Sequence, residues 1–222
     1  MKKSGERDVL VDLCIQREYL TLNGHPPCRN ASQVTLNVKH LMAFARLTKV
    51  PVVSCVDVNG GNRIGAEFVS IATRAAPQEQ KAAFTLLPRH TVVESDNSLC
   101  MPLDILKRHQ QVIFTKIHRD PFTNPKFDRL LTEMIAQRFV VFGIPLETSL
   151  RILVLGLLRR RRRVTLLTDA CGYWNREAAE MVLRQLGVKG CLLTSTNHYI
   201  ADALRRIARQ LRLRLRASRE VA

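Results

Sequence analysis

The chain has 222 residues, of which 46% are hydrophobic and 24% are charged, which supports one sizeable buried core and excludes a disordered or low-complexity chain. Lys and Arg number 35 against 19 Asp and Glu, giving a net charge of +16. This excess suits a polyanion, an anionic membrane surface or merely a solvated arginine-rich surface. No signal peptide is predicted at the basic N-terminus, and the six cysteines form no CxxC pair, so we expect a cytoplasmic protein with reduced thiols.

Short β-branched runs alternate with longer amphipathic stretches, a pattern typical of a parallel sheet with crossover helices. Helices are predicted over 32–48, capped by Ser32, and from Pro125 to Ile135, capped by Asn124. The pattern predicts an α/β fold, a three-layer α/β/α sandwich with a six-stranded, mainly parallel sheet in a single domain spanning 1–222. The six strands are 9–13, 50–57, 112–116, 139–142, 164–168 and 191–195, with weaker signals for a helix at 67–73 and a short strand at 91–94.

The longest apolar window, residues 140–158, is long enough to span a bilayer and is followed by five arginines. Glu147 and Arg151 lie inside it, so we predict a buried strand, turn and helix and expect no membrane partner. The basic C-terminal segment 205–222 has seven arginines up to residue 219. Strict alternation over 211–216 leaves three outcomes open, namely a longer helix, an edge strand in a dimer, or a basic tail.

Polar residues follow the predicted strands at their carboxyl ends, where open parallel sheets form their ligand crevice. Asp12 ends the first strand, Asp57 follows the second and Lys116 ends the third. A turn over 143–149 follows the fourth strand, and Asp169 follows the fifth. We expect Asp12 and Lys116 to act as a pair in an apolar crevice, either as a functional site or as a structural ion pair.

These segments resemble the isochorismatase-like superfamily of cysteine hydrolases, which includes nicotinamidases, N-carbamoyl amidohydrolases and isochorismatases. Residues 9–12 match a first strand ending in Asp, 112–116 a third strand ending in Lys, and 140–149 the segment Gly-hydrophobic-x-x-acidic-x-Cys. Residues 164–171 match a strand ending in Asp-Ala-Cys. The resemblance implies the strand order 3-2-1-4-5-6 and a homo-oligomer. It also implies Asp12, Lys116 and Ser149 as catalytic residues and Phe122, Gly143, Ile144 and Pro145 as substrate contacts.

Several residues depart from the family pattern. Ser149 stands at the nucleophile position, and a serine hydroxyl lacks the acidity of a thiol. Pro145, which follows the family's cis bond, has no N–H to donate to an oxyanion. Cys14 stands where a Gln usually follows the Asp by two residues. The zinc pattern Asp-x-His is Asp57-Val58-Asn59, so we expect neither a metal nor another cofactor.

The resemblance therefore disfavours a cysteine-type amidase and leaves two functions open. Isochorismatases proper protonate a vinyl ether from the Asp, so Asp12 and Lys116 would suffice to bind or hydrolyse a small carbonyl or enol-ether metabolite. The alternative is a catalytically silent binding or scaffold protein that contacts a polyanion through its arginine clusters. Nucleic acid is the less favoured partner, because no aromatic residues interleave with the arginines.

Overall fold

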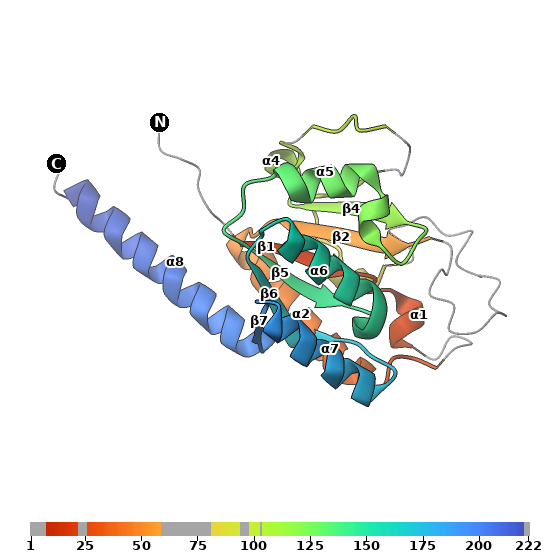
Figure 1. Cartoon of the computed structure of the whole chain (residues 1–222). Helices are drawn as coiled ribbons and strands as arrows, with labels where there is room; N and C mark the ends of the chain where they lie inside the picture. The colour runs from red at the N-terminus through yellow and green to blue at the C-terminus, as the bar shows by residue number, and fades with distance from the viewer. Residues whose placement is uncertain (1–7, 22–25, 59–80, 94–97, 103, 220–222) are drawn as a thin grey trace.

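A single parallel sheet organises the computed structural model, which describes residues 8–21, 26–58, 81–93, 98–102 and 104–219 (Figure 1). Its strand order is β3-β4-β2-β1-β5-β6-β7, so the predicted α/β class and the order of the six predicted strands are confirmed. The six-strand count is wrong, because the half-buried strand β3 adds a seventh at one edge. The strands are β1 Asp8–Leu13, β2 Val52–Asp57, β3 His90–Val93, β4 Gln111–Lys116, β5 Arg138–Gly143, β6 Val164–Cys171 and β7 Leu192–Thr194.

Helices connect the strands as the periodicity predicts. The Asn124 side chain accepts the N–H groups of Lys126 and Phe127 and so caps α5 as expected, whereas α2 begins after Asn30 and not at Ser32. The helices are α1 Arg17–Leu20, α2 Ala31–Thr48, α4 Ile105–Arg108, α5 Pro125–Glu133, α6 Arg151–Arg159, α7 Arg176–Val188 and α8 Thr196–Arg219, with the short turns η2 Ala83–Thr85, η3 Pro121–Thr123 and η4 Leu146–Leu150.

Alternate strand residues point to opposite faces of the sheet and bury two separate apolar layers. On the face that we call the α2 face, Leu10 and Val140 pack against α2 and α8. On the opposite face, the α6 face, Val11 and Val141 pack against α5, α6 and α7 (Figure 1). The two faces give the predicted three layers and decide which side chains can meet.

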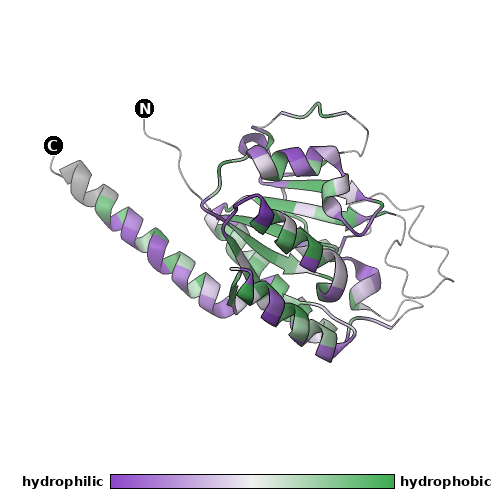
Figure 2. Cartoon of the chain, viewed as in Figure 1, coloured by the Kyte–Doolittle hydropathy of each residue, from purple (hydrophilic) through white to green (hydrophobic). Residues whose placement is uncertain are grey.

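The apolar window 140–158 folds as β5, η4 and most of α6, in agreement with the predicted strand, turn and helix. Among the described helices, none combines the length and apolar character needed to cross a bilayer. The alternating segment 211–216 continues α8, so the edge-strand and tail alternatives are wrong. Figure 2 shows apolar residues along the central strands and mainly hydrophilic residues along α8. The helical pattern expected at 67–73 lies outside the described residues.

Candidate functional site

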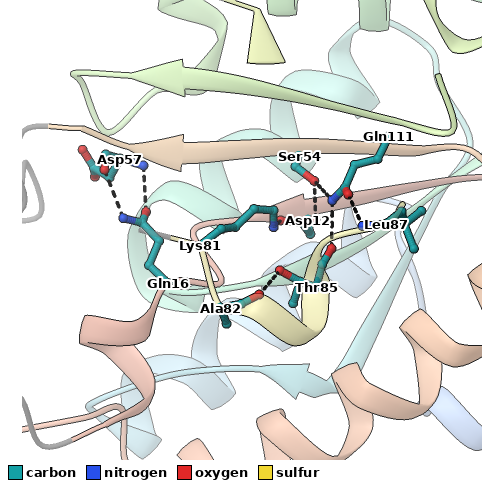
Figure 3. Close-up of polar contacts among 9 residues, drawn as sticks. All are labelled: Asp12, Gln16, Ser54, Asp57, Lys81, Ala82, Thr85, Leu87 and Gln111. Atoms are coloured by element: carbon teal, nitrogen blue, oxygen red, sulfur yellow. Dashed lines mark hydrogen bonds and ion pairs between the residues drawn. The ribbon is translucent and has the colours of Figure 1, made fainter. Parts of the chain in front are cut away.

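Asp12 lies near the carboxyl end of β1, opposite Ser54 of β2, and its side chain is on the α2 face. The carboxylate is fully buried. Lys81 Nζ lies 2.6 Å from its Oδ1, and the Ser54 hydroxyl donates to its Oδ2 at 2.5 Å (Figure 3). Both carboxylate oxygens therefore have strong partners inside the protein.

The same network fastens the segment that carries Lys81 to the sheet. Gln111 of β4 donates from Nε2 to Ser54 Oγ and to the Thr85 carbonyl, at 2.9 Å in each case. Its Oε1 accepts the Leu87 N–H at 2.7 Å (Figure 3). Burial of every polar partner makes this a structural network rather than an open site.

Lys116 ends β4 on the α6 face and pairs with a different carboxylate. Its Nζ lies 2.8 Å from Asp57 Oδ2 and donates to the His118 carbonyl at 3.2 Å. The expected Asp12–Lys116 pair is therefore wrong. Strand alternation places the two side chains on opposite faces of the sheet, and each is paired with another residue.

Cys14 directly follows β1 and lies in the same surroundings as Lys116. It has a left-handed backbone with φ of 52° and is buried in the α6-face layer. Burial raises the pKa of its thiol to about 12, although the charge of Lys116 opposes this rise and that of Asp57 adds to it. Burial would lower the pKa of Lys116, but the nearby Cys14 and Asp57 raise it above its ordinary value.

Gln16 indicates how this end of β1 aligns with the family pattern. Its amide exchanges two hydrogen bonds with the backbone of Asp57, of 3.0 and 2.7 Å. The family pattern places a Gln two residues after its Asp; with Gln16 as that Gln, the Asp position would be Cys14, which lies on the same face of the sheet as Lys116. The sequence contained this signal, but the acidic Asp12 suggested the earlier register.

The predicted turn from Gly143 to Ser149 forms after β5, and it lies against the end of β1. Ile144 donates to the Leu13 carbonyl at 2.9 Å, and the Ile144–Pro145 bond is cis. Ser149 is buried within η4, whose Leu146 and Leu150 pack in the same α6-face layer as Cys14. Ser149 and Lys116 are thus on the Cys14 side of the sheet, whereas Asp12 is not.

Phe122, an expected substrate contact, is packed against α6. The Arg160 guanidinium lies 3.9 Å from the centre of its ring, and a methyl group at Gly156 would come within 2.1 Å of the ring. The ring is half-buried. A role in substrate binding stays a prediction for Phe122, and packing accounts for its present position.

The residues present do not fit the zinc site of related proteins. The Asp57 carboxylate is already paired with Lys116, and the His of the Asp-x-His pattern is replaced by Asn59, which is outside the described ranges. Within those ranges, no three His, Cys, Asp or Glu side chains form a group able to hold a metal ion.

The chain matches the family model of the isochorismatase domain over residues 9–198 and belongs to that family. No curated protein sequence matches it. A pyrazinamidase of Pyrococcus horikoshii solved with zinc is 17% identical, with a TM-score of 0.64 and coverage of 85% of this chain and 98% of that one.

Two further solved structures have the same fold. An isochorismatase-like hydrolase from Alkaliphilus metalliredigens is 13% identical, with a TM-score of 0.65 and coverage of 88% and 98% of the two chains. The octameric hydrolase YcaC of Escherichia coli is 13% identical, with a TM-score of 0.56 and coverage of 85% and 74%.

Buried thiols should make the stability of the fold decrease at alkaline pH. Burial raises the pKa of Cys14 to about 12, and it also raises the pKa values of Cys55 and Cys171 well above the ordinary value. Above about pH 9 these thiols ionise only in the unfolded chain, so unfolding becomes more favourable as pH rises. We expect each to remove about 1.4 kcal/mol of stability per pH unit there. Urea unfolding between pH 8 and pH 10 measures this loss, and a flat profile would contradict it.

Proposed function

We propose that this chain is a non-hydrolytic member of the isochorismatase family, one that keeps the scaffold but lacks the reacting groups. One observation carries the proposal. Asp12, the carboxyl group expected to move the proton, is fully buried on the α2 face with both oxygens bound to Lys81 and Ser54. A binding or scaffold role is what such a protein retains.

The enol-ether chemistry expected from the sequence needs a carboxylic acid that touches the substrate. Asp12 has no exposed surface, and an ammonium group and a hydroxyl group occupy its two oxygens, so neither oxygen is free to approach a ligand. The geometry at Asp12 therefore supports a structural role.

The amide chemistry of the family finds no better support on the α6 face. A neutral Cys14 thiol, with a pKa of about 12, does not accept a proton near neutral pH. Lys116 is neutralised by Asp57, and Pro145 has no N–H for an oxyanion. Each of these features removes one part of the arrangement that amide hydrolysis at Ser149 would need.

A cavity of about 580 Å³ supports metabolite binding as a second candidate function. It lies between α1, α2 and η2, and its lining includes Arg17 and Lys39 together with the hydroxyl groups of Ser32 and Thr35. Two cations and two hydroxyl groups beside apolar walls suit a small anion. A homo-oligomer and a cytoplasmic location stay predictions.

The test is turnover by the purified chain. We expect no hydrolysis of pyrazinamide, an N-carbamoyl amide or isochorismate above the rate without protein, while a family amidase assayed in parallel turns over its amide. The Ser149→Ala and Asp12→Asn variants serve as controls. Turnover that disappears in either variant while the protein remains folded would overturn the proposal.

A further inference from the structure

The C-terminal half of α8 presents arginines in a single line. Arg205, Arg209 and Arg212, which we call the arginine row, are spaced four and three residues apart and so lie on one side of the helix. All three are exposed. The opposite side of α8 packs on the domain through Tyr199 and Ala203, which are buried. The arginine row therefore faces solvent.

The helix carries this row beyond the body of the protein. α8 begins at the carboxyl edge of the sheet, where Thr196 donates to Asp169, and passes the start of β1, where Arg206 lies 2.8 Å from Asp8. It then continues away from the sheet to Arg219 (Figure 1). The same spacing recurs in the sequence at Arg216 and Arg219, about 21 Å along the helix from Arg205.

The acidic residue of α8 next to the arginine row is Asp202, three residues before Arg205, and it pairs with Arg138 and Arg206 instead. No Asp or Glu occurs between 203 and 219, and within the described residues the row has no ion pair or side-chain hydrogen bond. Like charges four residues apart disfavour a helix, so this row costs stability unless an anion covers it. Acids at four-residue spacing pair Arg108 with Asp104, Arg129 with Glu133, Arg176 with Glu180 and Arg206 with Asp202.

A second set of exposed arginines lies at the same edge of the sheet, in the turn between α6 and β6. Arg160 pairs with Asp128, and Arg162 donates to the Thr132 carbonyl, so both are used inside the protein. The exposed members between and beside them are Arg159, Arg161 and Arg163. The turn and the arginine row therefore both place exposed positive charge at the edge of the sheet that lies opposite the candidate site.

We propose that the arginine row, with the turn over 159–163, binds the phosphate backbone of a nucleic acid. Guanidinium groups bind phosphate oxygens in pairs of hydrogen bonds, and 26 of the 35 basic residues are Arg. The sequence alone makes nucleic acid the less favoured partner. We now favour it, because α8 places arginines that are scattered in the sequence along one exposed line. With no aromatic platform beside them, recognition is of phosphates and not of bases.

Other occupants fit this helix less well. A second copy would bring the same charge of +16 against it. A membrane would be contacted by the apolar side of α8, where Leu204 and Leu211 lie seven residues apart and are about half exposed. The arginine row lies on another side of the helix, so insertion of the apolar side would leave the row facing water. Phosphate contacts need only the row.

Fluorescence anisotropy of the full chain with labelled 20-nucleotide RNA and a 20-base-pair DNA duplex tests the proposal. The triple variant Arg205→Gln, Arg209→Gln, Arg212→Gln should lose at least tenfold in affinity at low salt. Its slope of log affinity against log salt should fall by about 2 to 3, near one unit per lost contact. The matched control Arg29→Gln, Arg176→Gln, Arg184→Gln removes the same charge from exposed arginines outside the row and should change affinity less than threefold.

Equal losses in the two triple variants would overturn the proposal, as would no binding by the unmodified chain at low salt. A parallel experiment measures binding of the protein to phosphatidylcholine vesicles that contain phosphatidylglycerol, by sedimentation. Vesicle binding that needs the arginine row, in the absence of RNA or DNA binding, would assign the row to a membrane and also overturn the proposal. Circular dichroism confirms that each variant keeps its helix content.

Discussion

Replacing Lys81 by Met should destabilise the protein by about 3–5 kcal/mol, a large share of the stability of a typical domain. The change leaves the Asp12 carboxylate buried with the Ser54 hydroxyl as its remaining partner from the network. Lys81 lies shortly before Thr85 and Leu87, which bond to Gln111, so loss of the ion pair loosens the cover of the α2 face. Equilibrium unfolding in urea measures the effect.

Two further variants separate the buried pair from a general effect of removing charge. The double variant Asp12→Asn, Lys81→Met removes both charges and should recover most of the lost stability, because neutral groups of similar size carry a smaller desolvation cost. Arg176→Met breaks the exposed pair with Glu180 and should cost at most about 0.5 kcal/mol. A double variant as unstable as Lys81→Met would show that the ion pair is not what holds this segment.

Replacing Gly143 by Ala should cost about 3 kcal/mol or more. Gly143 has φ of 141°, which L residues rarely adopt, and an added methyl group would lie 2.1 Å from the Leu13 carbonyl oxygen of β1. Backbone strain and overpacking contribute about 1–3 kcal/mol each. Because the neighbouring atom belongs to the backbone of a central strand, the clash cannot be relieved by a rotamer change.

Gly190→Ala is the matched control for this variant. Gly190 also has a positive φ, of 92°, but nothing lies within 4 Å of an added methyl group. It should lose only the strain contribution, about 1 kcal/mol, and the difference between the two variants isolates the clash with Leu13. Equal losses in urea unfolding would mean that β1 moves to accommodate the methyl group.

The fold was predictable because its central strands are short β-branched runs buried on both faces, which local sequence identifies directly. The strand β3 gave only a weak signal, since its four residues are half-buried at an edge and include His90 and Thr91. The cap of α5 was predictable from Asn124 and Pro125. The Ser32 cap failed because the helix begins one residue earlier, where Asn30 precedes it.

The candidate site was only partly predictable, because side-chain direction depends on backbone conformation at the strand end. Simple alternation would send Asp12 and Cys14 to the same face. The left-handed backbone at Cys14 instead places it in the α6-face layer, while Asp12 remains on the α2 face. The partner Lys81 comes from a distant segment with no strand pattern around it, so nothing in local sequence indicates that it reaches Asp12.

Chemical labelling of the native protein, read by intact mass and peptide mapping, tests most directly whether the family scaffold here lacks an activated nucleophile. The protein is treated at pH 8 with iodoacetamide, which alkylates thiolates, and with a sulfonyl fluoride, which modifies activated serine hydroxyls. We predict one adduct, on the exposed Cys100, because the other five thiols and the Ser149 side chain are buried. An adduct on Ser149 or Cys14 of the folded protein would contradict a non-hydrolytic role.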